Sequence, residues 1–65
     1  MRPLVTLYTR PGCSLCDKMK TELEARGHAV EEVNIDLDPE LKRKYGRDIP
    51  VAVADGEEIA RHRLD

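Results

Sequence analysis

The chain begins with a run of apolar and β-branched residues over Leu4–Tyr8, which predicts a strand covered on both faces. Beyond it, apolar residues recur at every fourth position: Leu15, Met19 and Leu23. This spacing predicts a helix over Leu15–Arg26 with one buried face. Gly27 is expected to end that helix in a left-handed conformation, with Arg26 placed favourably against the helix dipole.

A second strand is predicted over Ala29–Asp36, chiefly from the alternation of Val33 and Ile35. One helix between two strands implies a right-handed crossover and parallel pairing. The first β-α-β unit is therefore expected to span Leu4 to Ile35.

Asp38 and Pro39 predict the start of a second, short helix. Asp38 can accept hydrogen bonds from the free amides of the first turn, and proline suits the first helical position. Leu41 and Tyr45, four residues apart, would form its buried face, and Gly46 is expected to end it.

The last third of the chain predicts a hairpin. Val51–Ala54 and Glu57–Leu64 are expected to be antiparallel strands, because Asp55-Gly56 is a favoured tight-turn dipeptide. The predicted order is β-α-β-α-β-β. This is an α/β fold with a four-stranded mixed sheet and two helices, in one domain covering residues 1–65.

Composition narrows the function classes. The 65 residues include 11 basic and 13 acidic side chains, for a net charge of −2, and the only aromatic residues are two tyrosines. This balance lacks the clustered basic excess and stacking aromatics of nucleic-acid binding proteins. No apolar run approaches the length of a membrane span, and the start does not resemble a signal peptide. We therefore expect a cytoplasmic protein without nucleic-acid or membrane partners, in which Lys42–Lys44 is a solvated face.

The two cysteines of the chain, Cys13 and Cys16, lie where the first strand gives way to the first helix. Free amides and the positive end of a helix stabilise a thiolate over a thiol. Cys13 is therefore predicted to attack a disulfide, and Cys16, one turn further on, to resolve the mixed disulfide. Arg10 adds a nearby cation, whereas Asp17 opposes the thiolate.

A Cys-x-x-Cys pair is also half of a zinc site. His28 lies about 15 Å or more from Cys16 along the helix, at ~1.5 Å per residue, and His62 belongs to the last strand. We therefore assign no metal ligand within one chain. A metal or iron–sulfur cluster shared between two chains stays open as the alternative function, that of a carrier module. The third alternative is a domain that only binds partners and in which the two cysteines have no chemical role.

Ile49 and Pro50 precede the third strand. Proline is common at the start of a strand. If the Ile49–Pro50 bond is cis, however, the Ile49 backbone would face the sulfurs and could pair with an extended, cysteine-containing substrate. Near the end of the sequence, Arg61 and Arg63 would keep an edge strand from pairing with another sheet, or would attract an acidic partner.

Three motifs together resemble the glutaredoxin-like proteins of the thioredoxin fold: Tyr8-Thr9-Arg10-Pro11-Gly12-Cys13-Ser14-Leu15-Cys16, Glu40-Leu41…Tyr45-Gly46 and Ile49-Pro50-Val51. The resemblance implies a thiol–disulfide oxidoreductase with Cys13 as nucleophile, Cys16 as resolving thiol and Pro50 as the cis-proline. It implies Ile49 as the substrate-pairing residue and Arg10 as a contact for a glutathione carboxylate. No built-in cofactor is expected. The implied partners are a disulfide-containing protein or glutathione, and a thioredoxin- or glutathione-type reducing system.

The chain departs from that pattern at three points. Ser14 stands where dithiol glutaredoxins usually have a proline that disfavours cluster binding. Ala60 and Arg61 stand where glycines admit glutathione, so glutathione is disfavoured as a dedicated partner. The usual C-terminal helix is absent from the predicted order. We therefore expect an apolar sheet face that a homodimer would cover, or a truncated chain.

Overall fold

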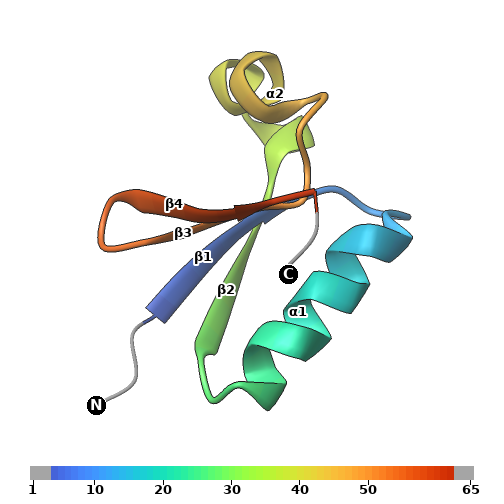
Figure 1. Ribbon diagram of the computed structural model, residues 1–65. Helices are drawn as coiled ribbons and strands as arrows, with labels where there is room; N and C mark the ends of the chain where they lie inside the picture. The colour runs from blue at the N-terminus through green and yellow to red at the C-terminus, as the bar shows by residue number, and fades with distance from the viewer. Residues whose placement is uncertain (1–3, 63–65) are drawn as a thin grey trace.

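Four strands form one mixed sheet in the order β2-β1-β3-β4, in a computed structural model that describes residues 4–62 (Figure 1). The elements are β1 (Leu4–Thr9), α1 (Ser14–Ala25), β2 (Ala29–Asn34), the 3-10 helix η1 (Ile35–Leu37), α2 (Pro39–Tyr45), β3 (Val51–Ala54) and β4 (Glu57–Arg61). Strand β1 pairs in parallel with β2 and antiparallel with β3, which pairs antiparallel with β4. The predicted α/β fold is confirmed.

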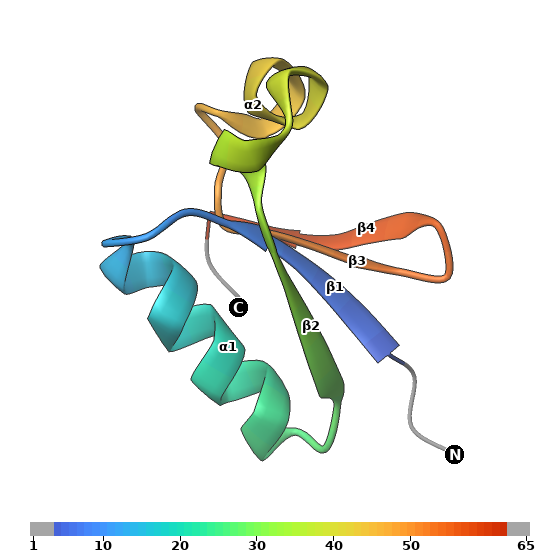
Figure 2. The ribbon, with the colours of Figure 1, turned by 180° about the vertical axis from the view of Figure 1, so that it is seen from behind.

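Helix α1 covers one side of the sheet, and α2 lies on the other, as the two opposite views show (Figures 1 and 2). Val5 and Leu7 of β1 both point to the α1 side, because successive side chains of a strand point to opposite faces of the sheet. The buried cluster on this side is formed by Val5, Leu7, Met19, Leu23 and Ala52. Met19 and Leu23 are buried as the helical spacing predicted. The prediction was wrong for Leu15, which is 55 % exposed, because in the first turn of α1 the side chain that faces the core is that of Cys16.

The α2 side has a second buried cluster, formed by Ile35, Tyr45 and Val51. Tyr8 packs against it from β1, and its ring stacks on that of Tyr45 with centroids 4.5 Å apart. Aromatic pairs of this kind add stabilisation beyond the area that they bury. The two tyrosines of the chain thus join the short helix α2 to the centre of the sheet.

Strand β2 ends earlier than predicted. The side chain of Asn34 accepts a hydrogen bond from the Asp36 amide at 2.9 Å, which turns the chain into η1. Ile35 is fully buried, but it lies in η1 and not in the strand. The prediction of a strand through Asp36 was therefore wrong at its end, and the first β-α-β unit closes at Asn34.

The predicted helix ends are largely confirmed. Gly27 has a positive φ of 93°, and the Asp38 carboxylate caps α2 by accepting from the Glu40 amide at 2.9 Å. Gly46 also follows the last residue of α2, but it does not adopt the left-handed conformation of Gly27, since its φ of −55° is right-handed. A side chain at Gly46 would overlap the carbonyl oxygen of Lys42.

The predicted hairpin turn is confirmed, with positive φ at both Asp55 and Gly56. Strand β4 ends at Arg61. His62 has a positive φ of 67°, outside the extended conformation of a strand, although its N–H still donates to the Pro50 carbonyl at 2.8 Å. The prediction of a strand through His62 was therefore wrong at that residue, and its last part, with Arg63 and Leu64, falls outside the described residues. No helix follows β4 within residues 4–62, and no helix in this range is long and apolar enough to cross a membrane.

The α1 side of β3 and β4 carries small side chains. Ala52 is buried, and Ala54 and Ala60 are half-buried against the same cluster. The large apolar side chains exposed among the described residues come from four separate elements: Leu4, Leu15, Leu37 and Ile59. A homodimer across the sheet face stays a prediction.

Replacing Leu23 by Ala should lower the free energy of unfolding by about 2–5 kcal/mol, because the 1 % exposed side chain would leave a cavity between α1 and β1. The matched control is Leu37→Ala in η1, where the side chain is 82 % exposed and the cost should stay within about 0.5 kcal/mol. Urea denaturation measures both. Equal losses in the two variants would contradict the packing described for α1.

Candidate functional site

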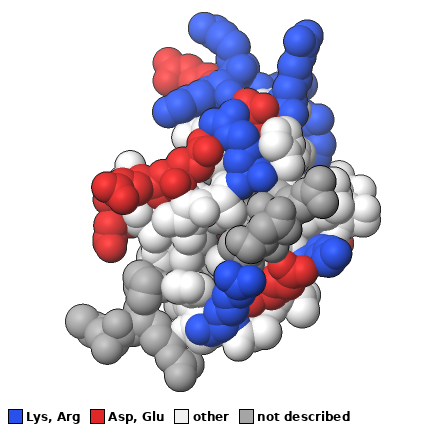
Figure 3. Space-filling model, viewed as in Figure 1, with Lys and Arg blue, Asp and Glu red and all other residues white. Residues whose placement is uncertain are grey.

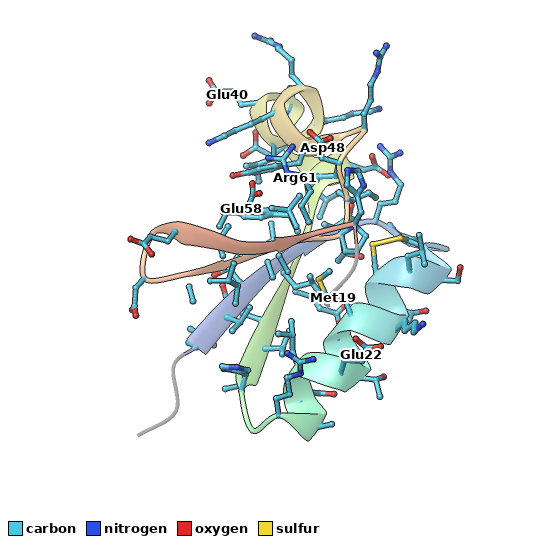
Figure 4. All side chains as sticks on the ribbon, in the orientation of Figure 1. Met19, Glu22, Glu40, Asp48, Glu58 and Arg61 are labelled. Atoms are coloured by element: carbon cyan, nitrogen blue, oxygen red, sulfur yellow. A yellow bond between two sulfur atoms is a disulfide. The ribbon has the colours of Figure 1, made fainter. Side chains whose placement is uncertain are left out.

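Cys13 is the N-cap of α1. Its backbone is extended, and its Sγ accepts the backbone N–H of Cys16 at 3.2 Å. The two Cα atoms are 5.2 Å apart and the sulfurs are in disulfide contact, visible in Figure 4 as the yellow bond at the start of α1. Cys13 is partly exposed, whereas only 2 % of Cys16 is exposed. The pair therefore has an outer sulfur, held by a helix amide, and an inner sulfur behind it.

A tight turn between β1 and α1 brings Cys13 to this position. Pro11 and Gly12 are its central residues, Gly12 has a φ of 82°, and the Cys13 amide donates to the Arg10 carbonyl at 3.4 Å. Proline followed by a residue of positive φ is typical of a type II turn. No atom within 4 Å would block a side chain on Gly12, so its backbone conformation is what requires glycine.

The start of α1 favours a thiolate at Cys13. The Cys16 N–H is one of the first-turn amides that lack a partner within the helix, and the helix dipole is positive at this end. Asp17 is exposed in the same turn and acts in the opposite direction. The Cys13 sulfur thus receives a direct N–H contact of the kind that stabilises a thiolate.

Arg10 is already paired within the chain. Its Nε and Nη2 donate to one carboxylate oxygen of Asp36, at 3.2 and 2.8 Å. The parallel register explains the meeting, since Thr9 lies opposite Asn34 and both strands end at the same edge. Sequence reasoning missed Asp36, although its place just after a parallel strand was a usable signal. A hollow borders this pair and is lined by Thr9, Arg10, Pro11, Gly12, Asp17, Glu32 and Asn34.

The Ile49–Pro50 bond is cis, and Pro50 is buried. Tyr8 lies opposite Val51 in the antiparallel ladder, so Pro50 lies at the edge from which the chain leaves β1 for the cysteines. The structure thus brings Pro50 and the Cys13 loop to one edge of the sheet. The Ile49 amide is occupied, because it donates to the Tyr45 carbonyl at 3.1 Å.

Besides the Arg10–Asp36 pair, a second group of paired charges lies next to the loop that carries Pro50. Arg61 forms ion pairs with Asp48 at 2.8 Å and with Glu58, and the three labelled side chains point toward one another in Figure 4. The hydrogen bonds from Arg61 lower the pKa of Glu58, and the same contact raises the pKa of Arg61. The sequence indicated Arg61 as an edge residue but missed Asp48 as its partner.

The two histidines are separated from the cysteines. His28 follows the far end of α1, and His62 lies 3.7 Å from Asp48 at the end of β4. Within the described part of the chain, no three or more His, Cys, Asp or Glu side chains gather in a way that could hold a metal ion.

Residues 4–65 match the glutaredoxin-like domain family (DUF836). The chain is 31 % identical over 71 residues to the glutaredoxin-like protein YDR286C homolog of Dictyostelium discoideum, covering 94 % of this chain and 66 % of that protein. It is 39 % identical over 54 residues to the glutaredoxin-like protein NrdH of Salmonella typhimurium, covering 77 % of this chain and 67 % of that protein. The chain thus spans about two thirds of the length of these relatives.

Two solved structures share the fold. The solution structure of protein Ne2328 from Nitrosomonas europaea matches with a TM-score of 0.89 and 30 % identity, covering all of this chain and 84 % of that one. A single-residue mutant of the thioredoxin-like protein BC3987 matches with a TM-score of 0.66 and 26 % identity, covering 86 % of this chain and 82 % of that one. With its Cys13-x-x-Cys16 pair at the start of α1, the chain belongs to the glutaredoxin-like family of the thioredoxin fold.

Proposed function

We propose that the chain is a thiol–disulfide oxidoreductase that reduces substrate disulfides through Cys13 and Cys16. The observation that carries the proposal is the N-cap geometry of Cys13, whose Sγ accepts the Cys16 amide while the Cys16 sulfur lies directly behind it. An exposed sulfur stabilised as a thiolate attacks, and a buried sulfur within reach completes the exchange.

The first step is an attack of the Cys13 thiolate on one sulfur of the substrate disulfide. A new S–S bond forms between Cys13 and the substrate, the substrate's own S–S bond breaks, and the departing sulfur leaves as a thiolate that takes a proton from water. The Cys16 amide remains directed at the Cys13 sulfur throughout, since it belongs to the backbone of α1.

In the second step, Cys16 loses its proton to solvent and its sulfur attacks Cys13. The mixed disulfide breaks, the second substrate thiol is released, and Cys13 and Cys16 become joined. Two electrons have then passed from the dithiol to the substrate. An external dithiol or thiol reductant must return them before the next turnover.

We favour a thioredoxin-type reducing system over glutathione as the source of those electrons. Arg10, the residue expected to contact a glutathione carboxylate, already donates twice to Asp36. At the end of β4, Ala60 and Arg61 occupy the stretch where glycines would admit that ligand, and Arg61 is paired with Glu58. A glutathione carboxylate would have to displace one of these internal partners.

Replacing Cys16 by Ser should trap the mixed disulfide, because the first step needs only Cys13. When the reduced variant is mixed with a disulfide peptide, mass spectrometry should show one peptide half attached to each chain. The matched variant Cys13→Ser should form no such adduct at the same pH and time. Rapid adduct formation by Cys13→Ser and none by Cys16→Ser would reverse the assigned roles of the two sulfurs.

Asp36 should moderate the reactivity of Cys13, because it neutralises Arg10 three residues before the nucleophile. In Asp36→Asn, the cation is no longer offset, and alkylation of reduced Cys13 by iodoacetamide at pH 6 should speed up by about twofold, the size expected of one solvent-exposed charge. Asp55→Asn removes the same charge at the distant hairpin turn and is the control. Identical rates in both variants would contradict a role for the Arg10–Asp36 pair.

A further inference from the structure

The loop that carries Ile49 and Pro50 is tied to the end of β4 on both sides of Ile49. Before Ile49, the Asp48 carboxylate pairs with Nη1 of Arg61 at 2.8 Å. After it, the Pro50 carbonyl accepts the backbone N–H of His62 at 2.8 Å. Arg61 and the residue after it therefore hold Asp48 and Pro50, the two neighbours of Ile49.

Arg61 is itself fixed in direction by Glu58. Its Nε and Nη2 donate to the two oxygens of that carboxylate, at 3.0 and 2.5 Å, which leaves Nη1 for Asp48. Figure 4 shows Arg61 between the two acidic side chains. This contact lowers the pKa of Glu58, so its carboxylate keeps its charge to a lower pH than an unpaired glutamate would.

A bulge in β4 makes this arrangement feasible. In a regular strand, residues three apart point to opposite faces. Here Arg61 lies opposite Val51 and Glu58 lies opposite Val53, so the register shifts by one residue at Ile59. The extra residue resets the alternation and brings Glu58 and Arg61 to the same face. The bulge thus presents the guanidinium to the loop that carries Pro50.

Ile49 has one backbone polar group left for a substrate. Its N–H donates to the Tyr45 carbonyl at 3.1 Å, and the Asp48 N–H donates to the same oxygen at 2.8 Å. Among residues 4–62, no hydrogen-bond donor reaches the Ile49 carbonyl. Pairing with an extended peptide therefore depends on that carbonyl, and a hydrogen bond weakens steeply as its distance and angle change.

We infer that Arg61 is a positioning residue for peptide disulfides. Through Asp48 it holds the Ile49 carbonyl where a backbone N–H beside the substrate cysteine can donate to it. This inference rests on the proposed function and narrows its substrate class to disulfides that carry a flanking peptide N–H. A merely stabilising role for Arg61 would instead affect every disulfide alike.

The test compares two disulfides that differ in having a peptide N–H. One is a synthetic peptide with an internal disulfide, and the other is bis(2-hydroxyethyl) disulfide, which has no amide. Second-order rate constants are measured for oxidation of the reduced protein in a single turnover, so no reductase is needed. The variants are Arg61→Met, Asp48→Asn and the double variant, with Arg61→Lys as the conservative replacement.

The matched control is Lys20→Met. It removes the Lys20–Glu32 ion pair, 2.7 Å long, whose side chains are 39 % and 41 % exposed, close to the 40 % and 32 % of Arg61 and Asp48. That pair joins α1 to β2 and leaves the loop of Ile49 untouched. Any effect common to the loss of an exposed ion pair will therefore appear in it.

With the peptide disulfide, Arg61→Met and Asp48→Asn should each slow the reaction by about two- to fivefold, the size that an exposed ion pair supports. The double variant should be no slower than either single variant, since both lose the same bridge. Arg61→Lys should recover part of the rate. Neither Lys20→Met nor any reaction with bis(2-hydroxyethyl) disulfide should change.

Equal slowing with both disulfides, or unchanged rates with the peptide, would overturn the positioning role of Arg61. Failure of the proposed function gives a different result, because wild-type protein would then be oxidised by neither disulfide. Urea denaturation of each variant establishes that it is folded under the conditions in which its rate constants are compared with those of the wild-type protein. Asp48→Asn, which keeps the shape of the side chain, tests the bridge even where Arg61→Met unfolds.

Discussion

The hydrogen bond from the Cys16 amide to the Cys13 sulfur is the contact on which the site depends. It forms because Cys13 is the last extended residue before α1, and Cys16 supplies one of the amides that a helix start leaves free. The same spacing places the Cys16 thiol on the buried side of the first turn. In the proposed function, this one capping geometry provides the nucleophile, the donor that stabilises it and the thiol that resolves its product.

The sheet brings the rest of the site to that contact. Antiparallel pairing of β1 with β3 places Pro50 at the edge where the Cys13 loop begins, and parallel pairing of β1 with β2 brings Asp36 to Arg10. The hairpin then returns β4 so that its end holds the Pro50 loop. Lys and Arg side chains gather over α2 in Figure 3, whereas acidic side chains gather over the hairpin.

Periodicity and turn chemistry predicted the element order, because strand alternation, the four-residue spacing in α1 and the Asp38 cap each have a local cause. They misplaced the end of β2, where the Asn34 side chain turns the chain before the buried Ile35. The cysteine pair was apparent from the sequence. The ion pairs of Arg10 and Arg61 were not, because each joins residues that only strand register or a bulge brings together.

The oxidoreductase function is tested most directly on protein purified anaerobically, by measuring its thiol titre and visible absorption. Turnover of a small disulfide is then followed with thioredoxin reductase or glutathione as the electron source. We expect a colourless, metal-free protein whose two thiols oxidise within one chain and turn over with the thioredoxin-type system. A coloured or zinc-loaded dimer with masked thiols would contradict the oxidoreductase and identify a metal or cluster carrier.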